Sequence, residues 1–149
     1  LFRKVRDDLG AAYYVKADSD LTLDHGYMSV AAGVDHLKIE IVIKAILEEM
    51  SRLTKELVPD VELQKSKDHL IGNFILGLEG SDDLASYYGG QEIITKKTKE
   101  PEEVIKNVKA VKSEEIRAVA KTLFVDRGLN LALIGPYKNS DNFKKILKF

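Results

Sequence analysis

The sequence opens with Leu-Phe-Arg-Lys-Val-Arg-Asp-Asp-Leu-Gly-Ala-Ala-Tyr-Tyr-Val, residues 1–15, which predicts a helix that ends at a glycine and leads directly into a strand. Leu1, Phe2 and Val5 have the spacing of one apolar helix face. Gly10 is the residue type that most often follows a helix end, and the five residues after it have β character. Because the apolar pattern is already in progress at Leu1, we expect the chain to continue a longer one on its N-terminal side.

The next segment predicts an antiparallel hairpin. Residues 11–19 and 26–34 both have strand character, and Asp24, His25 and Gly26 between them suit a turn. Simple alternation places four apolar residues of the second strand on one face: Met28, Val30, Ala32 and Val34.

Most of the remaining chain predicts helices. The longest, residues 36–57, has an apolar stripe at three- and four-residue spacing made of Ile39, Ile43, Ile46, Met50, Leu53 and Leu57. Further helices are predicted over residues 61–79, 81–95, from 101, and over 113–124 and 142–149. The apolar run 129–134 predicts a buried strand that returns to the hairpin sheet. We therefore expect an α+β fold in one domain, residues 1–149, with helices 36–57 and 61–79 packed on one face of an antiparallel sheet.

Composition excludes several classes of protein. Lys and Arg number 23 against 24 Asp and Glu, so the basic excess of a nucleic-acid-binding protein is missing. The absence of cysteine excludes disulfide scaffolds, thiolate metal sites and thiol nucleophiles. No apolar run is long enough to cross a membrane, and no signal-peptide pattern is present. We expect a cytoplasmic protein without membrane or nucleic-acid partners.

The residues offer little conventional catalytic chemistry. The three histidines, His25, His36 and His69, have no second histidine three or four positions away, so no local metal pair is predicted. His36 and Glu40 have helical i, i+4 spacing, which predicts a solvated surface contact. Serine-nucleophile and phosphate-loop motifs are also absent.

One junction has a more specific arrangement. Arg6 near the end of a helix and Tyr13 at the start of a strand can project into the same space across Gly10. An arginine offers a planar set of donors to peptide carbonyls, and a tyrosine hydroxyl can donate to a developing oxyanion. The alternative is structural: Arg6 favours the negative end of a helix, and Tyr13 lies in the core.

The same segment resembles the start of the second homologous domain in pitrilysin/insulinase-family zinc peptidases, in the branch that contains mitochondrial processing peptidase. The segment Asp24-x-Gly26-x-Met28-x-Val30 is similar to that family's next strand. Later parts of the chain also match, over Glu62-Leu63, Lys67, Leu70, Leu78-Glu79, the stretch 111–120 and the closing run 130–135. The matching positions of the first segment are Leu1, Phe2, Val5, Arg6, Gly10, Ala12, Tyr13 and Val15.

The resemblance implies a division of labour between two similar α/β domains. A first domain carries zinc on a His-x-x-Glu-His motif, and the second supplies an Arg/Tyr pair facing it. By that resemblance Arg6 binds the substrate backbone and Tyr13 both binds substrate and stabilises the tetrahedral intermediate. Tyr14 stands where serine is common in the family, so it is the rival phenol. His-x-x-Glu-His is absent from this sequence, so the chain holds no metal site and alone should be inactive.

The resemblance therefore implies the substrate-binding, transition-state-stabilising half of a zinc endopeptidase. Its partners would be a peptide substrate and a zinc-bearing domain or subunit, which holds the zinc cofactor. The first alternative is a non-catalytic scaffold subunit related to processing peptidase, which would not need Arg6 and Tyr13. The second is an unrelated α+β binding module, which a different sheet topology would favour.

Overall fold

The computed structural model describes residues 4–5 and 10–149, in two compact units. The first unit comprises Leu1–Glu56 with Arg117–Phe149, and the second is Leu57–Ile116. Each unit is considered by itself below. The expectation of a single domain over residues 1–149 stays a prediction.

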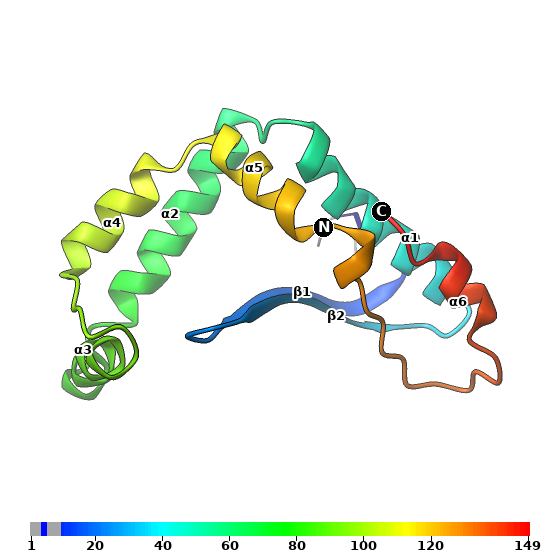
Figure 1. Ribbon diagram of the computed structural model, residues 1–149, viewed down its shortest axis with the longest axis horizontal. Coiled ribbons are helices and arrows are strands. Elements are labelled where there is room, and N and C mark those ends of the chain that lie inside the picture. The colour runs from blue at the N-terminus through cyan, green and yellow to red at the C-terminus, as the bar shows by residue number, and fades with distance from the viewer. Residues whose placement is uncertain (1–3, 6–9) are drawn as a thin grey trace. The chain divides into compact units, whose positions relative to one another are not determined.

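The hairpin of the first unit forms where the alternating pattern predicts it. Strand β1, Ala12–Leu21, pairs antiparallel with β2, Gly26–Val34 (Figure 1). At the turn, the Thr22 amide donates to the His25 carbonyl at 2.9 Å. Of the four residues expected on one face of β2, Met28 is 40% exposed, and the other three pack against the buried core. The alternation therefore predicts the inward face correctly except near the turn.

Helix α1, Ile39–Lys55, covers the inward face of the hairpin. Val42 and Ala45 join Val15 in one buried cluster, against which the inward residues of β2 pack. Ile43 and Leu47 join Phe143 in a second cluster. The helix is thus apolar on two sides, and three of its four buried residues, Val42, Ala45 and Leu47, lie outside the predicted stripe.

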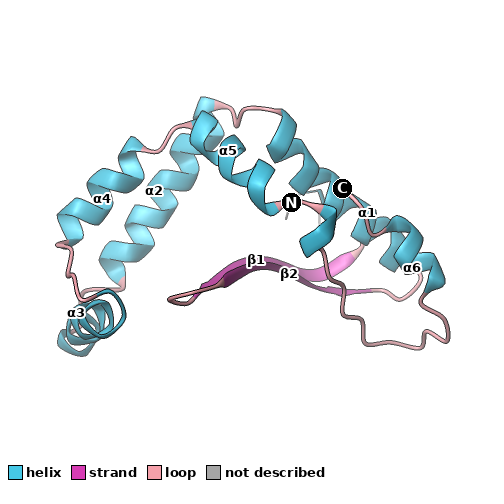
Figure 2. Ribbon diagram, in the orientation of Figure 1, coloured by secondary structure: helices cyan, strands magenta, loops and turns pink. Residues whose placement is uncertain are grey.

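The predicted strand over residues 129–134 is wrong. In the described residues the sheet has two strands, and 129–134 is irregular chain after the short 3₁₀ helix η2, Asp126–Gly128 (Figure 2). Leu129 and Leu133 pack against the cluster of Ile43, Leu47 and Phe143. Leu129 and Leu133 are half-buried by this packing, whereas Leu131 and Ile134 are exposed, so it accounts for only part of the apolar run.

The chain around this segment closes the first unit. Helix α5, Ser113–Leu123, precedes the segment, and α6, Asp141–Ile146, follows it. Phe124 after α5 is buried and lies 5.8 Å from Phe149, measured between ring centroids. The Phe149 amide donates to Asp126 Oδ1 at 2.8 Å, which ties the last residue to η2.

The second unit contains three complete helices and the start of α5: α2, Asp60–Leu76; α3, Ser81–Thr95; and α4, Pro101–Ala110. Phe74 meets Tyr87 edge to face at 5.6 Å between ring centroids. The Tyr88 hydroxyl donates to Glu100 Oε2 at 2.7 Å, and this bond raises the pKa of Tyr88 to about 12. Because α2 belongs to this unit, its packing on the hairpin sheet stays a prediction.

The architecture is α+β, as predicted, and the predicted boundaries of the helices after the hairpin agree with the observed ones to within a few residues. Most of the helix predicted to end at Gly10 lies outside the described residues. None of the helices among residues 4–5 and 10–149 is long and apolar enough to span a bilayer.

Candidate functional site

The Gly10 turn that leads into β1 is anchored in the core of the first unit. Val5 is fully buried, and its carbonyl accepts a hydrogen bond from the Ala11 amide at 3.3 Å. Lys38 Nζ donates to the Gly10 carbonyl at 3.0 Å. Gly10 has a φ of +51°, in the left-handed region that favours glycine. The junction is therefore fixed on both sides of the turn.

An ion pair attaches the preceding segment to α1. Lys4 Nζ lies 2.9 Å from Glu48 Oε2 and 3.4 Å from Glu49 Oε1. The hydrogen bond from Lys4 holds the pKa of Glu48 below its ordinary value, and the same bond raises the pKa of Lys4. Together with buried Val5, this contact holds the chain beside the predicted site residue Arg6.

Tyr13 is the extra residue of a β-bulge. Ala12 pairs with Val34 and Tyr14 pairs with Gly33, so no residue of β2 is left opposite Tyr13. Ala12 and Val15 both contribute to the core. Two residues rather than one lie between these inward positions, and both tyrosines are exposed. The structural alternative, in which Tyr13 is a core residue, is wrong because the bulge turns its side chain outward.

The two tyrosines have different surroundings. The Tyr14 ring lies so close to Gly33 that a β-carbon on that glycine would collide with it. Tyr13 is 80% exposed, against 57% for Tyr14, and neither hydroxyl has a hydrogen-bond partner among residues 4–5 and 10–149. The Tyr14 ring therefore covers the backbone of the neighbouring strand, and Tyr13 is the more exposed of the two phenols.

Arg6 lies outside the described residues. Its approach to Tyr13 stays a prediction, as do the assignments of substrate binding to both residues and of catalysis to Tyr13. Sequence reasoning missed the bulge and the contact between Tyr14 and Gly33. A glycine inside a predicted strand was the one signal, because such a glycine often marks a bulge or a close approach.

The histidines are engaged separately in the described residues. His36 Nδ1 lies 3.4 Å from Asp35 Oδ1, and His69 Nε2 lies 3.1 Å from the Asn73 amide nitrogen. The expected helical pair of His36 with Glu40 is wrong, because α1 begins only at Ile39. Within residues 4–5 and 10–149, no group of three or more His, Cys, Asp or Glu could hold a metal ion.

A hydroxyl, an imidazole and a carboxylate do meet at the hairpin turn. Thr22 Oγ1 lies 3.0 Å from His25 Nδ1, and the same nitrogen lies 2.7 Å from Asp24 Oδ1. A catalytic triad needs the base to use opposite ring nitrogens for its two partners. Because both contacts use Nδ1, this cluster stabilises a turn and does not activate the threonine. The contact with His25 also lowers the pKa of Asp24.

Comparison with known proteins gives a consistent pattern. The family model described as the Peptidase M16 inactive domain matches residues 1–70. The uncharacterized zinc protease YmxG of Bacillus subtilis is 30% identical over 139 residues, which are 93% of this chain and 34% of that protein. The uncharacterized zinc protease Rv2782c of Mycobacterium tuberculosis is 28% identical over 148 residues, 99% of this chain and 34% of that protein. The chain thus spans about a third of the length of these relatives.

Solved structures share the fold. A chain in the structure of complex III2 from Candida albicans, with Inz-5 bound, has a TM-score of 0.74 at 15% identity. The similarity covers 84% of this chain and 30% of that one. A protease from Helicobacter pylori has a TM-score of 0.70 at 21% identity, over 82% of this chain and 29% of that one.

Proposed function

The chain belongs to the M16 (pitrilysin) family of peptidases, as its inactive C-terminal domain, and on that premise we propose that it is the substrate-binding, transition-state-stabilising domain of a zinc endopeptidase. In this proposal it binds peptide in front of a zinc site that another domain or subunit provides. The relatives named as zinc proteases are about three times as long as the matched part, which leaves room for such a domain in them.

The sequence supports this division of labour. It contains no His-x-x-Glu-His motif, and its three histidines are far apart in the chain. Zinc would be held by that motif in the partner domain, where it would lower the pKa of a bound water and polarise the scissile carbonyl. This chain would contribute hydrogen-bond donors to the substrate backbone and to the oxyanion.

The observation that carries the proposal is the exposed phenol of Tyr13. A β-bulge turns it out of the core, and the buried Val5 and Ala11 on either side of the Gly10 turn fix the junction that leads to it. A hydroxyl held on a rigid strand needs little reorganisation when an oxyanion develops in front of it. Arg6, in the preceding segment, would bind a substrate carbonyl in both the ground state and the transition state.

The test uses Tyr13→Phe in the enzyme that includes the His-x-x-Glu-His domain. This change removes one donor and keeps the ring, and the ring is already exposed, so the free energy of unfolding should be nearly unchanged. Steady-state kinetics on a peptide substrate should show kcat lowered by about 10²–10³-fold. Tyr14→Phe is the matched control, with an expected kcat close to that of the wild type.

Arg6→Ala provides the second arm. Loss of a contact made in both ground and transition states should raise KM. A lowered kcat in Tyr14→Phe, with an unchanged kcat in Tyr13→Phe, would show that Tyr14 is the donor. If neither phenol nor Arg6 affects the kinetics, the scaffold alternative accounts better for the chain. A cytoplasmic location stays a prediction.

A further inference from the structure

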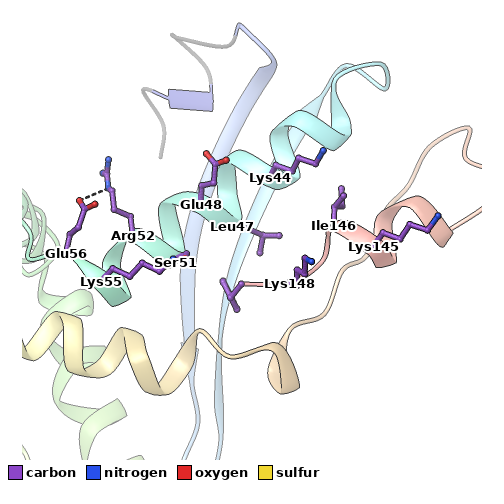
Figure 3. Close-up of a pocket in the computed structure, with 11 residues that line it drawn as sticks. Lys44, Leu47, Glu48, Ser51, Arg52, Lys55, Glu56, Lys145, Ile146 and Lys148 are labelled. Atoms are coloured by element: carbon purple, nitrogen blue, oxygen red, sulfur yellow. Dashed lines mark ion pairs between the residues drawn. The ribbon is translucent and has the colours of Figure 1, made fainter.

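A groove lies between α1 and the C-terminal segment of the first unit (Figure 3). It has a volume of about 460 Å³. Leu47 of α1 and Ile146 of α6 line it together with Phe149, and all three belong to or pack against one apolar cluster. The apolar floor is therefore part of the folded core of the unit.

The rim of this α1–α6 groove is positively charged. Lys44 and Lys55 stand on α1, and Lys145 and Lys148 stand on the opposite side (Figure 3). Each of the four is exposed, and none has an ion-pair partner among residues 4–5 and 10–149. Four unpaired cations on one groove are notable in a chain whose net charge is −1.

The acidic residues of the rim do not offset these lysines. Glu48 accepts from Lys4 at 2.9 Å, and Glu56 lies 3.9 Å from Arg52 Nε. Glu48 thus faces Lys4, and Glu56 shares Arg52 with Glu49, whose Oε2 lies 3.1 Å from Arg52 Nη2. An anionic ligand would be complementary to the four lysines of the rim. Its binding would displace no existing ion pair of these lysines.

The dimensions favour an extended ligand. Lys44 and Lys55 stand at the two ends of the face of α1 that lines the groove, and eleven helical positions correspond to about 16 Å. An extended chain of about five residues covers that distance. Acidic side chains could then reach the lysines on both walls while an apolar side chain contacts Leu47 and Phe149. A flat membrane surface fits a concave groove less well.

We propose that the α1–α6 groove binds an extended acidic peptide segment that carries at least one apolar side chain. The proposal does not depend on the proposed catalytic role of Tyr13. A failure here would leave that role untouched, because the test measures binding alone.

The test measures binding of a fluorescein-labelled peptide, Glu-Glu-Leu-Glu-Phe-Glu-Glu, to the full chain by fluorescence anisotropy. Saturable binding is expected, and it should weaken as salt screens the rim charges. The double variant Lys145→Glu/Lys148→Glu should weaken binding by about tenfold or more. Lys106→Glu/Lys109→Glu in α4 reverses two exposed lysines at the same spacing and should leave affinity unchanged.

A second variant and a second peptide make the result specific to the groove. Lys44→Glu/Lys55→Glu reverses the opposite wall without touching α6, and it should weaken binding by a similar factor. Replacing the leucine and phenylalanine of the probe by serine should also weaken binding by about tenfold, because the floor loses its apolar contact. In amide NMR spectra, peptide should shift the resonances of Leu47, Ile146 and Phe149.

Several outcomes would overturn the proposal. Equal losses in the groove variants and the α4 control would mean non-specific charge attraction. Undiminished binding of the serine peptide would exclude the apolar contact. Lysine-dependent binding to vesicles of phosphatidylcholine with phosphatidylserine, without peptide binding, would assign the rim to a lipid surface instead.

Discussion

The Tyr14 ring packs closely against Gly33 on the neighbouring strand. Tyr14 directly follows Tyr13, the extra residue of the bulge. A methyl group at Gly33 would overlap the Tyr14 ring, and the exposed ring would have to move away. Gly33→Ala should therefore lower the free energy of unfolding by about 1 kcal/mol, through the lost cross-strand contact. Urea denaturation measures this.

The control for that substitution is Gly72→Ala. Gly72 lies inside α2, and nothing lies within 4 Å of the position its β-carbon would take. Alanine favours a helix over glycine by about 1 kcal/mol, so this variant should be more stable than the wild type. If Gly33→Ala also stabilises the chain, the Tyr14 ring does not depend on that glycine.

The ion pair between Lys4 and Glu48 gives a pH dependence with a defined sign. The pKa of Glu48 is held below its ordinary value of 4.5, so its contribution to stability is present above that pH and is lost as pH falls through the lowered pKa. The pKa of Lys4 is raised above 10.5, so its contribution is present below 10.5 and is lost as pH rises through the raised pKa. Between these limits the contact favours the folded state.

Glu48→Gln should accordingly lower the free energy of unfolding at about pH 7, by a small amount because the pair is exposed. The difference from the wild type should shrink as the pH falls below 4.5 and through the lowered pKa of Glu48, because the wild-type carboxylate becomes protonated over that range. A series of urea titrations from neutral to acidic pH measures it. Glu79→Gln is the control, because Glu79 is exposed and has no ion-pair partner in the described residues. A difference that stays constant with pH would contradict the assigned sign.

Among the elements, α1 contributes most to the core of the first unit. It supplies four buried residues, and the core residues of the described chain all belong to this unit. Ile43 is 5% exposed, so Ile43→Ala should lower the free energy of unfolding by about 2–5 kcal/mol. Ile41 on the same helix is 53% exposed, and Ile41→Ala should change it by less than about 0.5 kcal/mol. Equal effects of the two changes in urea denaturation would mean that α1 is not oriented as described.

The helices were more predictable from sequence than the sheet. Ser81 and Pro101 each mark a helix start within the chain itself, and both observed helices begin at those residues. The run 129–134 has the composition of a buried strand, but composition does not say what covers it. Here Leu129 and Leu133 pack against the apolar cluster of Ile43, Leu47 and Phe143, and Leu131 and Ile134 are exposed. Long-range packing decides this, and it leaves no local signal.

The candidate site was predictable only in part, for a similar reason. The resemblance located Tyr13, and the structure adds that a bulge exposes it. A bulge depends on how the two strands pair, and alternation along β1 alone predicts Tyr13 on the same face as Val15. The family assignment from the resemblance is confirmed, and the processing-peptidase-like branch stays a prediction.

For the whole chain, the sharpest expectation concerns metal. The sequence has no cysteine, and its three histidines contact different partners: His25 at the hairpin turn, His36 beside Asp35, and His69 beside Asn73 on α2. A zinc site needs three or four converging ligands, and the described residues offer no such group. The purified chain should therefore retain far less than about one zinc per chain after dialysis, and it should not hydrolyse peptides.

Elemental analysis of the dialysed protein measures the zinc content. The matched sample is the same chain purified together with a domain that carries His-x-x-Glu-His, for which about one zinc per complex and peptidase activity are expected. Activity of that complex should disappear with a chelator and return with added zinc, because the metal supplies the activated water. About one tightly held zinc on the chain alone would contradict the proposed division of labour. It would mean that residues outside the described ranges, or a rearrangement of the histidines, complete a site.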